Sequence, residues 1–442
     1  MITMARPLFF LKTYQDIDQI IPVIWKTLRE GDSAMVIFVA EHDCDSDYRL
    51  QFLKKGFSLP IYKYPLAYKL TRKKWKVYKV IREAIFNDIT CGYFLKKHKI
   101  TSCVFEWGNA YGRDLRGHFF RAAKKMGIPT FSLPHGCRMF MHMVPVDLTE
   151  RKDSGFSEVQ NVYDEQLKKT LVNCPGLSER KDSDFAVVRN IYDKQLKDIQ
   201  VSYPDLSERN NFDFYVVQSN YDKQLNVAMG LNPEKTLVVW GSARFCPEWA
   251  KTNLKICPEF VPSKSDKDKV KVVFMLYHWK YNIDQRSCID LIEKLVLCKW
   301  VYLIIKDHTR GVGGLPNELR NRYNSFPNVE SSVSAHSPAL IKWSDVVINF
   351  ASSIGVEALI QGKQLIHPFY LHGNVTIFDK TEAAHLARNH DEVIGLLQKF
   401  KDGKLPPVSE ESKRKLYREV IYGGRDEYDV LEYYWRKITL RQ

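Results

Sequence analysis

The stretch NFASSIGVEALIQGKQLIHPF, residues 349–369, joins an apolar Val-Val-Ile run to an expected helix and then to a second expected strand. Ser352, Ser353 and Gly355 stand at the turn, and Glu357 follows one helical turn later. A strand that runs into a helix leaves unpaired N–H groups at the positive end of the helix dipole. Small and hydroxylic residues there either cap the helix or let an anion such as phosphate approach it.

Strand-like and helix-like segments alternate along the rest of the chain. The first half contains the apolar runs PLFFLK, AMVIFVAEH and SCVFEWG, and the second half contains KVKVVFMLYHW, WVYLIIKDH and DVVINFASS, with helical patterns between them. This alternation predicts an α/β protein with two Rossmann-like parallel-sheet domains that face each other across a cleft. Ligands of such folds bind outside the carboxyl ends of the strands, where the unusual residues of this chain gather.

A 29-residue repeat separates the two halves. Its copies begin at Leu148, Leu177 and Leu206, and only the third is followed by the strand and helix that an α/β domain needs. The first two copies are therefore interpreted as a duplicated insertion, which is either a tolerated surface excursion or a flap for oligomerisation or acceptor binding. The predicted domains are 1–147 (N-terminal, on the acceptor side), 148–205 (the repeat insertion), 206–400 (C-terminal, nucleotide-binding) and 401–442 (C-terminal helices, with a return to the N-terminal domain as one option).

The charge favours an anionic partner. The 442 residues include 66 basic and 52 acidic side chains, a formal net charge of +14. Such a balance suits nucleic acid, lipid headgroups or phosphorylated substrates. No zinc-ligand spacing, aromatic RNA-binding motif or helix-turn-helix signature is present, so we expect no nucleic-acid partner. Residues 69–86 combine seven basic side chains with Trp75 and Tyr78. They are either a helix for an anionic membrane surface or a solvated basic face.

The cysteines and the hydropathy favour the cytoplasm. Nine cysteines are scattered without a Cys-x-x-Cys pair, which suits reduced thiols. No run of about 18 apolar residues is present, as a transmembrane helix would need. We expect a cytoplasmic protein, with peripheral attachment to the inner face of the membrane as an option.

Two strand ends in the first half carry candidate catalytic residues. Glu106 follows the apolar strand in CVFEWG, and His135 lies in the Pro-His-Gly corner after TFSLP. Either side chain can take a proton from a hydroxyl nucleophile. Glu106 has the alternative role of accepting hydrogen bonds from the next helix, and His135 that of a buried structural histidine.

The second half supplies the candidate phosphate ligands. Lys306, His308 and Arg310 alternate at the end of VYLIIKDHTR, so they share one side if the strand continues. Arg244, in WGSARF, is a further candidate. Cationic side chains there would stabilise a departing phosphate. The glycines that follow fit no mononucleotide or dinucleotide motif. Only Asp43-Cys44-Asp45 has the letters of a metal motif after a strand, and we expect no metal and no cofactor besides the donor substrate.

Taken together, these motifs resemble the GT-B class of nucleotide-sugar transferases, and in particular the bacterial surface-polysaccharide sialyl- and Kdo-type transferases with cytidine-activated donors. The resemblance implies Glu106 as the base, His308 as the nucleotide ligand, and Ser352 and Ser353 as the phosphate ligands. His135 followed by glycine is similar to the His-Gly motif of the CDP-glycerol glycerophosphotransferase-like group. Those relationships imply a CMP or CDP moiety in the donor.

The resulting hypothesis is a metal-independent glycosyltransferase that moves a sugar or ulosonic acid from a nucleotide donor to a hydroxyl of a surface glycan or lipid-linked acceptor. A capsule or lipopolysaccharide pathway is the expected setting. The alternatives are a polyol-phosphate transferase with a CDP-polyol donor and a non-catalytic nucleotide- or glycan-binding scaffold. A sugar-nucleotide epimerase shares the architecture but would convert its donor without an acceptor.

Overall fold

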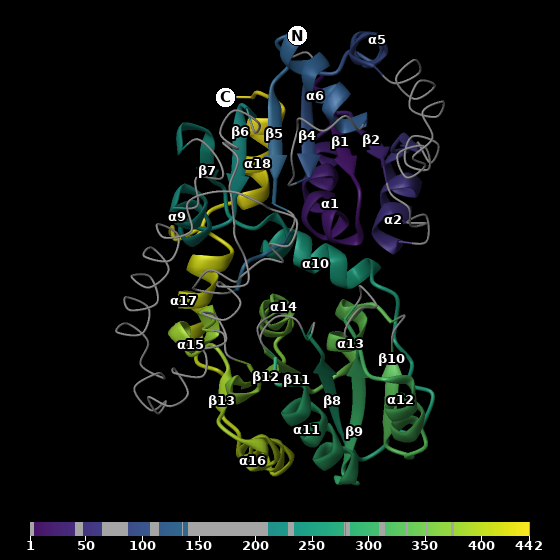
Figure 1. Cartoon of the computed structure of the whole chain (residues 1–442), viewed down its shortest axis with the longest axis vertical. Coiled ribbons are helices and arrows are strands. Elements are labelled where there is room, and N and C mark those ends of the chain that lie inside the picture. The colour runs from purple at the N-terminus through teal and green to yellow at the C-terminus, as the bar shows by residue number, and fades with distance from the viewer. Residues whose placement is uncertain are drawn as a thin grey trace, which may run out of the picture. The chain divides into compact units, whose positions relative to one another are not determined.

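The chain folds into two compact units. A computed structural model describes residues 4–39, 47–63, 87–106, 115–134, 136–139, 211–228, 234–277, 279, 283–308, 314–332, 335–350, 352–372 and 375–441. The N-terminal unit is formed from Met1–Cys137, Asp205–Ile256 and Arg418–Gln442, and the C-terminal unit from Arg138–Pro204 and Cys257–Tyr417. Figure 1 labels the elements of both units, and each unit is described by itself below.

The N-terminal unit contains a parallel sheet with the strand order β3-β2-β1-β4-β5-β6-β7. The strands are β1 (Pro7–Leu11), β2 (Met35–Phe38), β3 (Ile61–Lys63), β4 (Ser102–Glu106), β5 (Thr130–Leu133), β6 (Phe214–Val217) and β7 (Leu237–Val239). The helices are α1 (Tyr14–Arg29), α2 (Tyr48–Phe57), α5 (Asp88–Lys97), α6 (Leu115–Lys125), α9 (Asn220–Ala228), α10 (Pro247–Ile256), α18 (Val430–Ile438) and the 3-10 turns η3 (Glu234–Thr236) and η4 (Ala243–Phe245).

A stacked pair of buried rings and a buried carboxylate stabilise the start of this sheet. The strand residues Phe10 and Phe105 are buried, and their rings stack with centroids 4.5 Å apart. The carboxylate of Asp16 is fully buried and accepts the backbone N–H groups of Lys12 and Thr13 at 2.9 and 2.6 Å. That carboxylate satisfies donors that the first turn of a helix would otherwise leave unpaired, so β1 ends and α1 begins at a defined place.

The C-terminal unit repeats the design with the parallel strand order β10-β9-β8-β11-β12-β13. The strands are β8 (Val270–Met275), β9 (Val301–Lys306), β10 (Val329–Ser332), β11 (Val346–Asn349), β12 (Gln364–Pro368) and β13 (His385–Ala387). The helices are α11 (Gln285–Leu297), α12 (Asn317–Asn324), α13 (Ser337–Trp343), α14 (Ile354–Ile360), α15 (Ile377–Thr381), α16 (His390–Lys401), the 3-10 turn η5 (Phe369–Leu371), and α17 (Glu410–Val420), which ends in the N-terminal unit.

The α/β class with two Rossmann-like parallel sheets is confirmed, but the boundary predicted at residue 206 is wrong. Strands β6 and β7 pair with β5 and with each other, so they extend the N-terminal sheet. Strand β6, which lies in the third repeat copy, therefore belongs to the first sheet, because it pairs with β5. The duplicated insertion 148–205 lies outside the described residues.

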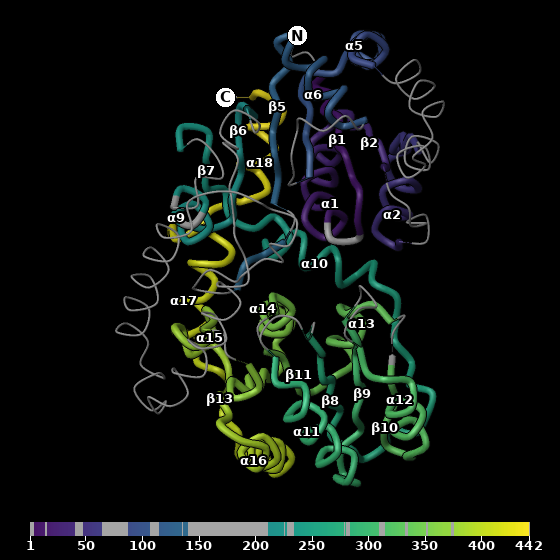
Figure 2. The backbone as a smooth tube through the Cα atoms, viewed as in Figure 1, coloured from purple at the N-terminus to yellow at the C-terminus, as the bar shows by residue number. Residues whose placement is uncertain are grey.

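The C-terminal segment belongs to the N-terminal unit. Figure 2 shows the yellow tube of α18 among the elements of that unit. The indole N–H of Trp435 donates to the buried Asp32 carboxylate at 2.9 Å. The hydroxyl of Tyr434 donates to the Gly241 carbonyl at 2.9 Å, and the Ser242 N–H donates to the Ile421 carbonyl at 2.8 Å. The last two bonds join the end of the chain to the loop after β7, and the first joins it to the loop between α1 and β2.

No helix in the described part of the chain combines the length and the apolar character needed to cross a bilayer. The basic segment 69–86 falls between Lys63 and Asn87, outside the described residues, so the proposed surface helix stays a prediction.

The contact at Gly241 yields a stability prediction. Gly241 has a φ of +79°, and a Cβ there would lie 2.2 Å from the Ile421 carbonyl oxygen. In Gly241→Ala the segment around Ile421 must shift, and the hydrogen bond from the Ser242 N–H to the Ile421 carbonyl weakens. We expect this to lower the free energy of unfolding by about 1–3 kcal/mol beyond the cost of the left-handed conformation. Gly31→Ala is the matched control, because Gly31 has a φ of +83° and open space around it. We expect Gly31→Ala to lower the free energy of unfolding by about 1–2 kcal/mol. Equal losses in chemical denaturation would contradict the close contact.

Candidate functional site

The C-terminal sheet has a topological switch point between β8 and β11. The chain passes from β8 through β9 to β10 on one side of β8, and then from β11 through β12 to β13 on the other. The connections that follow β8 and β11 therefore run to opposite sides, and ligands of open α/β sheets typically bind at the carboxyl edge of such a point. This edge is the candidate site.

A row of mostly polar side chains ends the four central strands. Lys306 of β9 pairs with Met275 of β8, and Met275 pairs with Asn349 of β11. His367 of β12 continues the row, because Ile348 and Ile366 are partners one position earlier. Paired residues of parallel strands point to the same face, so these side chains lie side by side. The previous row on that face is wholly apolar: Ile304, Val273, Val347 and Leu365.

Lys306 is a buried cation in this row. The residue as a whole is only 3% exposed. Burial lowers the pKa of the Lys306 ammonium from 10.5 to about 8, and the neighbouring charge of Asp307 offsets part of that effect. An ammonium held in such surroundings gains stability from any anion that reaches it, because the anion compensates the lost hydration. The strand end thus holds a group suited to a phosphate.

The loop after β9 is held by Asp307. Its carboxylate accepts the Leu315 N–H at 3.1 Å and pairs with Arg320 at 2.5 Å, so the two sides of the loop are fixed together. The ring of His308 lies edge-on to Tyr277, with centroids 5.9 Å apart. The predicted alternation of Lys306, His308 and Arg310 needed a strand that continues, but β9 ends at Lys306, and Arg310 lies outside the described residues.

The opening stretch lies at the same edge. Ser352 and Ser353 are half-buried between β11 and α14. Ser353 has helical dihedral angles and its side chain makes no cap hydrogen bond, while the Ser352 hydroxyl accepts the Ile354 N–H at 3.4 Å. Simple capping therefore explains little of this pair. Glu357, in the first turn of α14, is buried at 9% exposure.

Gly355 has a packing role, and its predicted role as a phosphate ligand stays a prediction. It is a buried residue, and a Cβ there would lie 2.7 Å from the Phe378 ring and 3.2 Å from the Leu365 side chain. Any larger residue would push against these groups. The absence of a side chain at Gly355 thus permits close packing of α14 on β12 and α15, and an approaching anion is not needed to explain it.

Two members of the row, Asn349 and His367, are not among the residues predicted from the sequence. Asn349 is 1% exposed, and neither its amide nitrogen nor its amide oxygen has a hydrogen-bond partner among the described residues. His367 is fully buried, and its Nδ1 lies 3.2 Å from the Asn349 carbonyl oxygen, while its Nε2 lies 3.7 Å from the Asp379 carboxylate. The available signal was a polar residue at or next to the last position of a strand that is otherwise apolar.

Glu106 ends β4 at the corresponding edge of the N-terminal sheet, next to its switch point between β1 and β4. The residue is 3% exposed, and one carboxylate oxygen pairs with Arg116 of α6. The other oxygen, Oε2, has no hydrogen-bond partner among the described residues. Burial lowers the pKa of Arg116, and the charge of Asp16 opposes that effect. His135 lies outside the described residues.

Arg244 lies in the N-terminal unit, whereas Lys306 belongs to the C-terminal unit. It sits on η4, and its guanidinium is 3.3 Å from the Asp18 carboxylate and 4.9 Å from the Phe245 ring centroid. Because Asp18 already engages it, Arg244 would have to exchange that partner for a phosphate. Its assignment as a phosphate ligand stays a prediction.

Metal ligands do not gather in the part of the chain that the structure describes, where no three His, Cys, Asp or Glu side chains are grouped as a metal site requires. Asp43 and Asp45 fall outside that part. The expectation of metal-independent chemistry therefore stays a prediction.

The fold is similar to those of sugar-nucleotide epimerases. The UDP-GlcNAc 2-epimerase of Methanocaldococcus jannaschii aligns with a TM-score of 0.52 and 12% sequence identity, over 93% of this chain and 98% of that one. A second crystal structure of a UDP-N-acetylglucosamine 2-epimerase aligns with a TM-score of 0.50 and 12% identity, over 97% and 99% of the two chains. The sequence matches no protein-family model, and a search of curated proteins found no match.

At this level of identity the similarity establishes the fold alone. The two parallel sheets with alternating helices are those of a two-domain, Rossmann-like protein of GT-B type. The resemblance to sialyl- and Kdo-type transferases and to the CDP-glycerol group goes beyond this finding.

The buried ammonium of Lys306 leads to a stability prediction. In the unfolded chain its pKa is near 10.5, whereas in the folded chain it is about 8. Between these values the unfolded chain binds more protons, so the free energy of unfolding rises with pH across that window. We expect Lys306→Met to be more stable than the wild type at about pH 7, by on the order of 2 kcal/mol, because no ammonium is buried.

The measurement is urea denaturation at about pH 7 and about pH 10, where the advantage of Lys306→Met should shrink. Lys299→Met is the matched control, since Lys299 is exposed and precedes the other end of β9. A Lys306 variant that is less stable than the wild type at both pH values would show that the ammonium has a strong internal partner.

Proposed function

We propose that this protein is a nucleotide-sugar-dependent glycosyltransferase that binds its donor at the carboxyl edge of the C-terminal sheet. The acceptor is a hydroxyl of a glycan or a lipid-linked sugar. The observation that carries the proposal is the row of Lys306, Asn349 and His367 at the switch point between β8 and β11. Charged and polar groups at that place of an α/β sheet are typical of a nucleotide site.

The chemistry of this edge suits a departing phosphate. Glycosyl transfer breaks the bond between the sugar and the phosphate oxygen, and negative charge grows on that oxygen. The buried ammonium of Lys306 would stabilise it without solvent reorganisation. Ser352 and Ser353, half-buried at the same edge, would donate hydroxyl hydrogen bonds to the remaining phosphate oxygens.

Glu106 is the proposed base for the acceptor hydroxyl, with His135 as the alternative. A base must take a proton, and the guanidinium of Arg116 opposes this because it stabilises the ionised carboxylate. Oε2 of Glu106, which has no hydrogen-bond partner in the part of the chain that the structure describes, is the atom proposed to accept the hydroxyl proton. Arg116 would accordingly have to loosen its contact with Glu106 as the proton arrives.

Epimerisation of a sugar nucleotide is the second candidate. It is favoured by the names of the similar structures, which are UDP-GlcNAc 2-epimerases. The same anion site would serve both reactions, but an epimerase changes the sugar of the donor without an acceptor. The transferase resemblance implies a cytidine moiety in the donor, whereas the names of the similar structures contain UDP. One binding experiment can distinguish these two nucleotides.

Nucleotide binding provides the first test. We expect one of CMP, CDP, UDP and GDP to raise the melting temperature selectively, because ligands that bind the folded state stabilise it by mass action. Calorimetry with that nucleotide should show binding weakened about 10- to 100-fold in Lys306→Met, as expected for the loss of a charge-assisted hydrogen bond. Lys299→Met should bind like the wild type. In the wild type, affinity should fall as the pH rises through about 8. Equal affinity in all three proteins would place the nucleotide elsewhere.

Product analysis provides the second test. Glu106→Gln should lower the transfer rate by at least about 100-fold with little change in nucleotide affinity, since a general base acts only on the reaction step. Glu234→Gln, on the exposed turn η3 of the same unit, is the control and should retain activity. An isomerised donor sugar in the absence of acceptor, detected by NMR, would favour the epimerase instead.

A further inference from the structure

Apolar side chains gather on the outward face of α5 in the N-terminal unit. Ile89 is 83% exposed and Tyr93 is 66% exposed. They are four residues apart, so they are neighbours on one face of the helix. Met126, 43% exposed at the end of α6, borders this face, because its sulfur would lie 3.8 Å from a Cβ built on Gly92. Single exposed apolar residues are ordinary, whereas a group of three at one place indicates a contact surface.

The opposite face of α5 explains why these side chains stay outside. Cys91 and Leu95 are buried in the core of the N-terminal unit, and Phe94 packs against it. Ile89 and Tyr93 face away from that core. Neither residue is therefore needed to hold α5 in place.

Lysines surround the apolar group. Lys96 and Lys97 are exposed and lie seven and eight positions after Ile89, which returns them to the same face. Lys125 of α6 has a side chain that is 72% exposed. Together these side chains form the α5 patch: Ile89, Tyr93, Lys96, Lys97, Met126 and Lys125.

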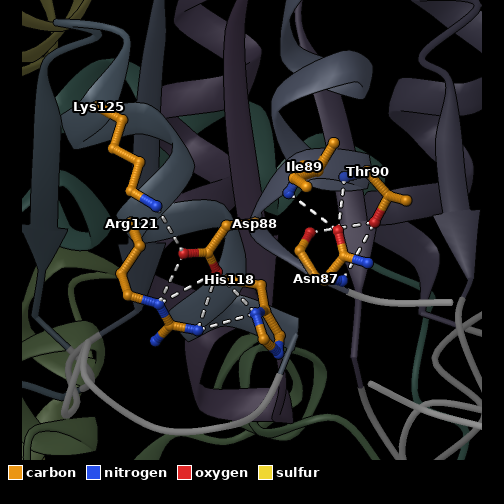
Figure 3. A network of polar contacts seen from close by, with 7 residues as sticks. All are labelled: Asn87, Asp88, Ile89, Thr90, His118, Arg121 and Lys125. Atoms are coloured by element: carbon orange, nitrogen blue, oxygen red, sulfur yellow. Dashed lines mark hydrogen bonds and ion pairs between the residues drawn. The ribbon is translucent and has the colours of Figure 1, made fainter. Parts of the chain in front are cut away.

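The single carboxylate in the sequences of α5 and α6, Asp88, is already engaged. Figure 3 shows Arg121, His118 and Lys125 converging on it. His118 lies 2.8 Å and Arg121 3.1 Å from one carboxylate oxygen, and Lys125 lies 3.3 Å from the other. Although burial would raise the pKa of Asp88, these hydrogen bonds hold it at about 2. Asp88 is therefore ionised and offset by its own neighbours, and the outer lysines keep the patch positive.

We propose that the α5 patch docks on a bilayer surface that contains anionic lipid. Lysines attract anionic headgroups, while a tyrosine ring and short apolar side chains enter the boundary between headgroups and acyl chains. Charge complementarity selects this partner, because the patch is basic and its carboxylate is engaged. A protein partner or a second copy would need about 20 to 30 residues a side, far more than the patch offers.

The test is flotation of the full-length protein with vesicles of phosphatidylcholine alone or mixed with phosphatidylglycerol. The wild type should float with the mixed vesicles at low salt and not with phosphatidylcholine alone. Lys96→Gln with Lys97→Gln should weaken binding about 30-fold, from roughly 1 kcal/mol for each charge near the surface. Ile89→Asn with Tyr93→Ser should also reduce binding, and this loss should persist at high salt, where the lysines contribute little.

Matched controls come from the C-terminal unit. Leu297→Ser replaces a side chain that is 72% exposed, and Lys399→Gln with Lys404→Gln removes two exposed lysines. Both controls should float like the wild type. Unchanged flotation of the two α5 variants would overturn the proposal and assign membrane binding to another segment, such as 69–86. A wild type that does not float, or floats equally without phosphatidylglycerol, would also overturn it, as would a dimer in solution that Ile89→Asn with Tyr93→Ser dissociates.

Discussion

The parallel pairing of β8 with β9 on one side and β11 on the other is the constraint on which the C-terminal site depends. It buries these strands among other strands and beneath helices, so their interior rows must be apolar. A polar side chain in those rows would lose its hydration without compensation. The last row at the carboxyl edge escapes this restriction. Lys306, Asn349 and His367 lie in that row, at the switch point where ligands of open α/β sheets typically bind.

The two units handle a buried charge at a strand end in different ways. In the N-terminal unit Glu106 is paired with Arg116, so the charge is compensated within the protein. In the C-terminal unit Lys306 is buried with its pKa lowered towards 8, and the neighbouring charge of Asp307 compensates it only in part. Asp307 is itself pinned by Arg320 and by the Leu315 N–H. Burial of the Lys306 ammonium costs stability, and such costs are common at functional sites.

The N-terminal unit is assembled from distant parts of the chain. Strands β6 and β7 extend a sheet that begins at Pro7, and α18 docks against Asp32 through Trp435. These contacts are specific hydrogen bonds and close backbone approaches, of which Gly241 against Ile421 is the tightest. Helix α5 packs on the core of this unit through Cys91, Phe94 and Leu95, so Ile89 and Tyr93 on its outer face are left exposed.

The sequence by itself determined the fold class, because alternating apolar runs and helical patterns permit little else than parallel sheets covered by helices. It also located Glu106, Lys306, Ser352 and Ser353 at strand ends, since the end of an apolar run is visible in the letters. The tertiary structure alone decided which strands are neighbours. It showed that Asn349 and His367 share a row with Lys306, that Arg244 faces Asp18, and that Gly355 makes room for Phe378. Strand order and register are set by contacts between residues far apart in the chain, and a local pattern carries no information about them.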